Sequence, residues 1–334
     1  MKNLWMSLVL LSMLGLAVPA AAQKVELLNA SYDVSRELFA EINPAFQAAW
    51  LAKTRQHVEI RQSHGGSSRQ ARAVSEGLRA DVVTFNQATD IDFLVKSGLV
   101  GKDWQKKFPN GSSPYYSLPV FLVRQGNPKN IRDWDDLAKA DVKPVFPNPK
   151  TSGNGRYTYL SAYAYGIEKN GGDVAKTQAL VGALLGNVPV FDTGGRGATT
   201  TFVERQIGDV LVTFESEVIA IRNEYASANL QVVYPSVGLR VDFPVAVVDK
   251  VVIRNGTRDV ATAYLQFLWS DAGQEILAKK FNRVRNPAIA ARYESQFPTV
   301  HLVSVEDAFG GWDRVTAEHF GSDGILDKLL LAKR

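Results

Sequence analysis

Phe146-Pro-Asn-Pro-Lys-Thr-Ser-Gly-Asn-Gly-Arg-Tyr-Thr-Tyr-Leu160 is the stretch that decides the fold. Its pattern predicts a short apolar strand over 142–146, a Pro-rich turn, and a helix that begins near Ser152 and continues through Tyr165. The first N–H groups of a helix have no partner inside the helix, and glycine lets a ligand approach them closely. Because the helix dipole adds to these donors, the turn is typical of an anion site. Taken alone, it is better explained as an ordinary helix start after a strand.

Turns of this kind recur along the chain. Each joins a predicted strand to a predicted helix and is rich in small residues with hydrogen-bond donors: 31–35, 65–68, 152–155 and 194–198. In the first, Asp33 is suited to cap the helix that follows, and in the second Ser67 with Gln70 forms a capping-box pattern. Ligands of open α/β sheets lie beyond the carboxyl ends of the strands. We therefore expect four helix starts to converge on one cleft.

Strand and helix patterns alternate over the whole chain, which indicates an α/β fold with parallel sheets covered by helices. In the first half, strands are predicted at 24–29, 57–61 and 81–85, with a helix at 91–97. In the second half, strands are predicted at 120–124, 142–146, 188–191, 209–214 and 243–253, followed by amphipathic helices at 261–269 and 273–281. The length is sufficient for two domains.

The N-terminal segment predicts export. Residues 1–22 have Lys2 in a positive region, an apolar core from Leu4 to Leu16, and small residues before Gln23, as in a cleavable signal peptide. The chain contains no cysteine, so a hydrophobic core must hold the exported protein together. Its formal net charge of +4 includes Lys2, and its basic residues are dispersed, which argues against nucleic acid as a partner.

Enzymatic motifs and metal patterns are missing from the sequence. It contains no G-x-S-x-G elbow and no phosphate loop of the G-x-x-x-x-G-K-[ST] type. The four histidines are scattered without the spacing of metal ligands. We therefore expect a binding protein with neither catalytic residues nor a metal or cofactor. An enzyme acting on sulfate or phosphate esters is the main alternative.

Several longer strings resemble a known family. They are Leu27–Asp33, Gln62–Ser68, Pro147–Gly153, Asp192–Phe202, Gly208–Glu217 and Phe309–Trp312. Over nearly all of the chain after residue 22, the sequence is similar to the periplasmic sulfate-binding proteins of ABC importers. The strings Ser-Gly-Asn-Gly-Arg-Tyr-Thr-Tyr, Asp-Thr-Gly-Gly-Arg-Gly and Thr-Phe-Glu-Ser-Glu-Val resemble the thiosulfate-binding branch more than the sulfate branch.

The resemblance implies a fold and a way of holding the ligand. The fold would be a two-domain periplasmic binding protein of type II, with the ligand cleft between two mostly parallel sheets. Domain I would comprise 23–118 plus 250–334, and domain II 119–249. A dehydrated tetrahedral dianion would be held by hydrogen bonds alone, without a direct positive charge.

The same resemblance implies the ligand-binding residues. Phe214 stands where the sulfate branch has a tryptophan that donates its indole N–H, so a site for sulfate alone is less expected. Asn154 and Gly195 replace a glycine and an alanine of that branch, and the Asn154 side chain is a possible substitute donor. For Arg196, between two glycines, a structural ion pair is expected rather than contact with the anion. Asp33 is expected to contribute its main-chain N–H. The other expected ligand-binding residues are Ser67, Ser152, Gly153, Asn154, Gly195 and Phe214.

The function implied is the solute-binding component of an ABC importer. It would bind thiosulfate and sulfate in the periplasm as a monomer and deliver them to a membrane permease. A strictly sulfate-binding protein and an oxyanion sensor subunit without a role in transport are the alternatives.

Overall fold

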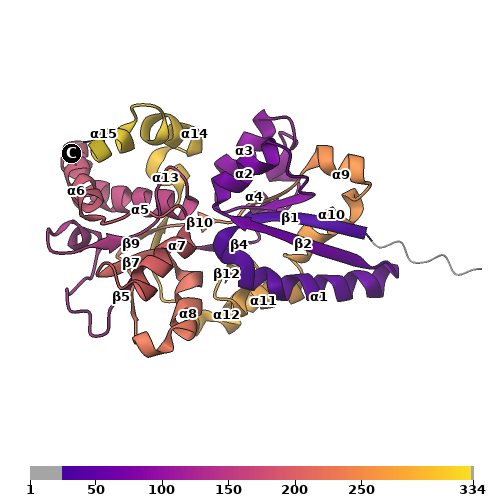
Figure 1. The fold of residues 1–334 in the computed structure, drawn as a ribbon, viewed down its shortest axis with the longest axis horizontal. Coiled ribbons are helices and arrows are strands. Elements are labelled where there is room, and N and C mark those ends of the chain that lie inside the picture. The colour runs from indigo at the N-terminus through magenta and orange to yellow at the C-terminus, as the bar shows by residue number, and fades with distance from the viewer. Residues whose placement is uncertain (1–24, 332–334) are drawn as a thin grey trace, which may run out of the picture.

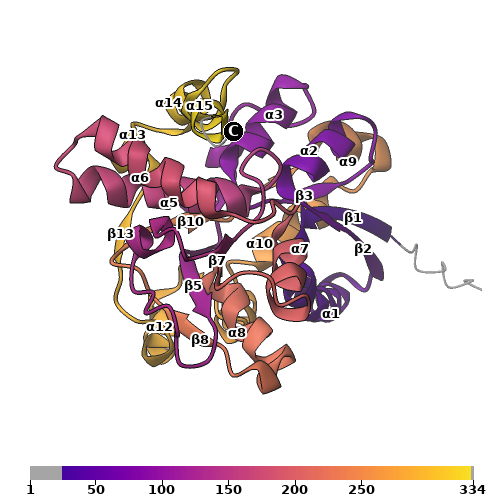
Figure 2. The ribbon, with the colours of Figure 1, turned by 60° about the vertical axis from the view of Figure 1, so that its left-hand side comes forward.

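The structure is a computed structural model that describes residues 25–331, so the predicted signal segment 1–22 lies outside the described residues. Two α/β lobes lie side by side, one built mainly from the first hundred residues and one mainly from the middle of the chain (Figures 1 and 2). Within residues 25–331, no helix is both long and apolar enough to cross a membrane. The predicted two-domain α/β architecture is confirmed.

The first lobe contains a four-stranded sheet in the order β11-β3-β1-β2. Strand β1 pairs in parallel with β2 and β3, whereas β11 is antiparallel to β3. Its strands are β1 (Val25–Tyr32), β2 (Val58–Gly65), β3 (Val82–Thr84) and β11 (Val245–Val247). Its helices are α1 (Arg36–Thr54), α2 (Ser67–Ser75), α3 (Ala88–Lys96), α9 (Asp249–Asn255), α10 (Arg258–Phe267) and α11 (Asp271–Lys279).

The second lobe contains a four-stranded sheet in the order β6-β7-β5-β8. In this sheet β6 and β7 pair in parallel, whereas β5 is antiparallel to both β7 and β8. Parallel pairing therefore dominates in the first sheet but not in the second. The strands are β5 (Pro119–Val123), β6 (Pro144–Val145), β7 (Val210–Phe214) and β8 (Gln231–Val233), and the helices are α5 (Gly153–Lys169), α6 (Val174–Asn187), α7 (Gly195–Thr199) and α8 (Glu215–Glu224).

A small antiparallel sheet lies where the chain crosses between the lobes. It joins β10 (Val241–Asp242), β4 (Tyr115–Ser117) and β12 (Arg283–Val284). The guanidinium of Arg283 donates to both carboxylate oxygens of Glu215, at 2.7 and 2.9 Å, in a largely buried pair. This two-point contact ties the crossing strand β12 to the first turn of α8.

The C-terminal segment packs against the second lobe. Strand β13 (His301–Val303) pairs in parallel with β9 (Val237–Leu239), and α15 (Ile325–Leu331) contacts α6. Figure 1 shows this segment in yellow, with α13 (Val305–Phe309) and α14 (Trp312–Val315) above α5. We therefore propose a domain division that assigns residues 301–331 to the second domain rather than to the first.

Two strand predictions were wrong in instructive ways. Residues 188–191 form no strand, since Pro189 has no N–H to donate to a ladder. The predicted long strand 243–253 is only β11, and helix α9 begins at Asp249. The Asp249 carboxylate accepts a hydrogen bond from the N–H of Gly101 at 2.8 Å and pairs with Arg258. Tertiary contacts thus override the strand propensity of the valine-rich run.

A histidine anchors the C-terminal segment to α5. The buried His319 has its Nδ1 atom 2.8 Å from the hydroxyl of Tyr159. Three further rings, those of Tyr163, Phe309 and Phe320, surround the imidazole. Burial lowers the pKa of His319 to about 4, since the charged ring would lose its hydration.

The lowered pKa of His319 predicts that packing of the C-terminal segment against α5 is sensitive to acid. A histidine of lowered pKa is protonated more readily in the unfolded chain, so stability is complete above the unfolded pKa of about 6.5 and falls as the pH drops toward 4. We expect the urea midpoint to fall between about pH 7 and pH 5, and His319→Gln to reduce that fall. The exposed His301 supplies the control, His301→Gln, which should behave as wild type. An equal fall in the His319→Gln variant would show that His319 is not responsible.

Candidate anion site

The start of α5 presents free donors. Ser152 is the N-cap residue, with its carbonyl accepting the first helical hydrogen bond from the N–H of Arg156 at 3.0 Å. Among residues 25–331 its hydroxyl makes no capping bond, although Ser152 is buried. The N–H groups of Gly153 and Asn154 belong to the first turn and have no carbonyl within the helix to accept from them. One hydroxyl and two N–H groups are therefore available at one point.

The helix starts of the second lobe press against the first lobe. A methyl group on Gly153 would lie 2.1 Å from Oδ1 of Asn86, which follows β3. A methyl group on Gly194, the N-cap of α7, would lie 2.5 Å from Oδ2 of Asp33, which follows β1. Real Cβ atoms essentially never show distances below 3.0 Å, so a side chain at either position would force Asn86 or Asp33 to shift in this closed arrangement.

The turn before α2 also lies against the turns of the second lobe. A methyl group on Gly66, which precedes α2, would lie 3.2 Å from the carbonyl oxygen of Thr151 and 3.5 Å from that of Thr193. The hydroxyl of Thr151 in turn donates to the carbonyl of Thr193 at 3.2 Å. The expected meeting of four helix starts, two from each lobe, is thus present in the structure.

Asp33 differs from its predicted role as a helix cap. It is the first residue of a short 3₁₀ helix, Asp33–Ser35, whose N-cap is Tyr32. Its carboxylate crosses to the other lobe and accepts from the N–H of Arg196 at 3.3 Å. Burial raises the pKa of Asp33, while the N–H groups of Arg196, of Asp33 itself and of Val34 oppose that rise. The carboxylate is therefore occupied by backbone donors.

Ser67 is the first residue of α2 and is fully buried. The predicted capping box is absent, because the N-cap is Gly66 and the side chain of Gln70 accepts from Ser63 instead. The Ser67 hydroxyl accepts a hydrogen bond from the N–H of Asn86 at 3.5 Å. This serine therefore stands at the junction of α2 with the end of β3.

Asp90 lies directly behind Ser67 in α3. Burial raises the pKa of this carboxyl, while Arg156 and hydrogen bonds from Ser67, Gln87 and Ser68 oppose the rise. The side-chain amide of Gln87 donates to Asp90 at 2.6 Å. The carboxyl thus forms the back wall of the first-lobe side of the site.

Asn154 has a side-chain partner of its own. Its Nδ2 donates to Oγ1 of Thr213 at 3.1 Å, and Thr213 donates to Oε2 of Glu217 at 2.5 Å. All three side chains are buried. Burial raises the pKa of Glu217 to about 8, the Thr213 hydrogen bond opposes this, and the nearby Asp33 adds to the rise. Glu217 is therefore mostly uncharged at neutral pH.

Phe214 ends β7 and is completely buried. Its ring stands edge-to-face with those of Phe243, at 5.6 Å, and Tyr157, at 6.2 Å between ring centres. A phenyl ring cannot donate a hydrogen bond. This position therefore supplies an apolar wall where the indole implied for the sulfate branch would supply a donor.

Arg196 forms the structural ion pair that was expected. Its guanidinium lies 2.5 Å from the carboxylate of Glu37 in α1, and both side chains are about half exposed. An exposed pair of this kind contributes little stability, about 0–1 kcal/mol. It joins α7 of the second lobe to α1 of the first at the edge of the candidate site.

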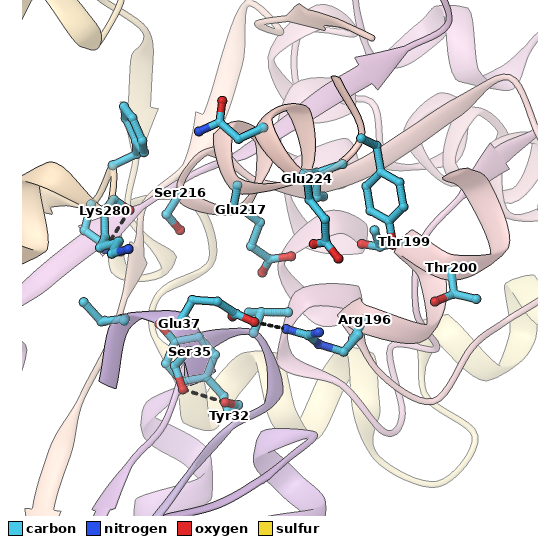
Figure 3. A pocket seen from close by; sticks show the side chains of 18 of the residues that line it. Tyr32, Ser35, Glu37, Arg196, Thr199, Thr200, Ser216, Glu217, Glu224 and Lys280 are labelled. Atoms are coloured by element: carbon cyan, nitrogen blue, oxygen red, sulfur yellow. Dashed lines mark hydrogen bonds and ion pairs between the residues drawn. The ribbon is translucent and has the colours of Figure 1, made fainter. Parts of the chain in front are cut away.

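A cavity of about 730 Å³ opens beside these turns (Figure 3). Its lining includes Tyr32, Arg196 and Glu217, but Ser67, Ser152 and Asn154 lie outside it. Its lining carries charges of both signs, with the glutamates Glu37, Glu204, Glu217 and Glu224 beside the basic residues Arg196, Lys279 and Lys280. The candidate anion site is therefore the buried meeting point of the turns, and not this cavity.

Three residues of the candidate site were not singled out from the sequence: Asn86, Thr213 and Glu217. Asn86 lies two residues after the end of β3, and a polar residue at the carboxyl end of a parallel strand is a signal that points to a site. Thr213 and Glu217 are four residues apart and come together only because β7 runs directly into α8. Within residues 25–331, no group of three or more acidic or histidine side chains is arranged to hold a metal ion.

Comparisons with known proteins identify the family of the chain. Residues 27–282 match the family model described as bacterial extracellular solute-binding protein. A thiosulfate-binding protein of Pseudomonas aeruginosa is 55% identical over 94% of this chain and 95% of its own length. A sulfate-binding protein of Escherichia coli is 47% identical over 94% of this chain and 95% of its own.

A solved structure is similar over the same region. The sulfate-binding protein SubI from Mycobacterium tuberculosis has a TM-score of 0.80 and 33% identity, covering 88% of this chain and 98% of its own. These relatives are solute-binding proteins rather than enzymes. The chain belongs to the family of bacterial extracellular solute-binding proteins.

Proposed function

We propose that this protein is the solute-binding component of an ABC importer and that it binds thiosulfate and sulfate in the periplasm. The observation that carries the proposal is the meeting of four helix starts from two lobes at one buried point. Relatives named for thiosulfate and for sulfate support it over nearly the whole chain. As a monomer, the loaded protein would present both lobes to a membrane permease, and no turnover of ligand is expected.

The donors that we assign to the anion come from both lobes. The second lobe contributes the N–H groups of Gly153, Asn154 and Gly195 and the hydroxyl of Ser152. The first lobe contributes the N–H of Asp33 and the hydroxyl of Ser67, and Phe214 provides an apolar contact. A buried dianion is stable only when its oxygens are fully hydrogen-bonded, and helix starts supply aligned donors without a counter-charge.

The arrangement favours anions that carry no proton. Sulfate and thiosulfate are fully ionised at neutral pH, so an acceptor facing them would be repulsive. Phosphate, usually protonated at neutral pH, would gain from such an acceptor. The one carboxylate at these turns, Asp33, already accepts from the backbone of Arg196, which supports the sulfur oxyanions over phosphate.

Titration calorimetry with thiosulfate, sulfate, phosphate and molybdate tests this function. We expect heat of binding with thiosulfate and sulfate and little with phosphate. A chromogenic sulfate ester should remain unhydrolysed by the same preparation. Failure of both sulfur oxyanions to bind would refute the proposal.

The hydroxyl of Ser152 should contribute directly to affinity. We expect Ser152→Ala to weaken thiosulfate and sulfate binding by about 1–3 kcal/mol, the usual effect of losing a hydrogen bond to a charged group. Ser161 offers a matched control on the same helix, since it is also buried and its hydroxyl has no partner among residues 25–331. Calorimetry should find Ser161→Ala close to wild type. Equal affinities for the two variants would mean that the ligand lies elsewhere.

Gly153 should be needed for closure of the two lobes around the ligand. A methyl group there would lie 2.1 Å from Oδ1 of Asn86, so Gly153→Ala should hold the lobes apart. Small-angle scattering at saturating thiosulfate should give a larger radius of gyration than wild type, and Asn86→Ala should partly restore it.

The control for this substitution is Gly186→Ala in α6. Apart from its chain neighbours and the nearby backbone of α6 itself, no atom of the described residues lies within 4 Å of the added methyl group. Its radius of gyration with ligand should equal that of wild type. If Gly153→Ala compacts as wild type does, the closed contact with Asn86 is not part of the ligand-bound state.

Phe214 should set the preference between the two anions. We expect thiosulfate to bind wild type at least as well as sulfate, because an apolar ring can contact a sulfur atom that accepts hydrogen bonds poorly. Phe214→Trp adds an indole donor and should shift the affinity ratio toward sulfate by up to about 1–3 kcal/mol. Phe214→Leu, which adds no donor, should not. A competition assay in which Trp and Leu give the same ratio would contradict this role.

A further inference from the structure

Three buried side chains form a continuous hydrogen-bonded chain behind the proposed site. Asn154 lies in the first turn of α5, Thr213 near the end of β7, and Glu217 in the first turn of α8. The Asn154 Nδ2 to Thr213 Oγ1 distance is 3.1 Å and the Thr213 Oγ1 to Glu217 Oε2 distance is 2.5 Å. Their exposed fractions are only 3%, 1% and 7%. Three separate elements thus meet at a polar contact that water does not reach.

The two hydrogen bonds that link Asn154, Thr213 and Glu217 run in one donor-to-acceptor direction. A threonine hydroxyl carries a single hydrogen, which Thr213 donates to Glu217. Its lone pairs are then left to accept, so the atom of Asn154 that faces Thr213 must be the amide nitrogen. The orientation of the Asn154 side chain is therefore set by Thr213 and Glu217.

The amide nitrogen has a second hydrogen. Among the described residues, Thr213 is the acceptor that the Nδ2 atom of Asn154 reaches. The same nitrogen lies 3.5 Å from the point where a Cβ atom on Gly195, the first residue of α7, would sit. It therefore stands between the starts of α5 and α7, which both belong to the proposed anion site.

We propose that Thr213 and Glu217 are positioning residues that hold the Asn154 amide so that its second N–H donates to the bound oxyanion. This donor compensates for Phe214, which offers none. The inference rests on the proposed function, and it explains how a site without an indole retains sulfate alongside thiosulfate.

The charge state of Glu217 suits this role. Its Oε1 is buried and has no hydrogen-bond partner within residues 25–331. With the pKa of Glu217 raised to about 8 by burial, a proton on Oε1 keeps the carboxyl neutral at pH 7 and leaves Oε2 to accept from Thr213. The charged or titratable groups facing Glu217 are Asp33, Glu37, Arg196 and Tyr32. A neutral carboxyl here avoids repelling the dianion.

A double-mutant cycle tests the positioning role. Thr213→Val keeps the shape but removes the hydroxyl, and we expect it to weaken sulfate and thiosulfate binding about tenfold. Asn154→Ala should have a similar effect, and the double variant should be no weaker than Asn154→Ala alone. Thr213→Ser should restore affinity to within about twofold of wild type, because the hydroxyl returns.

The control is Thr201→Val. Thr201 is fully buried and its hydroxyl has no partner among the described residues, so this variant should bind as wild type does. Wild-type affinity in Thr213→Val, or additive losses in the double variant, would overturn the inference while leaving the proposed function intact. Lack of binding by wild type would overturn both.

A pH profile supplies a second readout that does not depend on the folding of Thr213→Val. Above about pH 8, ionised Glu217 should repel the dianion, so wild-type affinity for sulfate should fall. Glu217→Gln stays neutral and can still accept from Thr213, so its affinity should remain level from about pH 7 to pH 9. Parallel profiles for the two proteins would contradict the proposed role of Glu217.

Discussion

An anion stripped of water is stable in a protein only where donors surround it, and in the proposed site that requirement would govern how closely the two lobes approach. Helix starts can act as donors only if no side chains separate them from the ligand. Gly153 against Asn86 and Gly194 against Asp33 meet at distances that leave no room for a Cβ atom. The closed arrangement, the small residues of the turns and the proposed site are therefore consequences of one constraint.

The buried carboxyl of Glu217 behind the donors is compatible with an anion because burial suppresses its charge at neutral pH. Burial raises the pKa of Asp90 and of Glu217, which favours the protonated forms. Asp90 accepts hydrogen bonds from Ser67, Gln87 and Ser68 and lies close to Arg156, so it holds the Ser67 side chain in place. A neutral Glu217 can accept from Thr213 without placing a negative charge nearby. The buried acids thus orient the donors instead of opposing the ligand.

Local patterns predicted the α/β fold, the helix starts and the convergence of the turns, because apolar periodicity and small-residue turns act over a few residues. Predictions that depended on distant partners were less accurate. The capping role of Asp33 was wrong because its carboxylate reaches Arg196 on the other lobe. The contacts of residues 301–331 with the second lobe, and the chain from Asn154 to Glu217, likewise depend on tertiary packing that no short pattern encodes.

Selectivity in such a site can change without loss of the fold, because most of the proposed donors are backbone groups. A main-chain N–H survives any substitution except proline, so Asn154 and Gly195 can replace other residues while their N–H groups stay in place. Side chains then adjust the preference: Phe214, enclosed by Phe243 and Tyr157, removes a donor and adds an apolar face. Since thiosulfate carries one sulfur atom that needs no strong donor, one missing donor matters less for it than for sulfate. In the proposed site, the preference between the two anions therefore depends on the Phe214 wall and on the Asn154 side-chain donor that compensates for it.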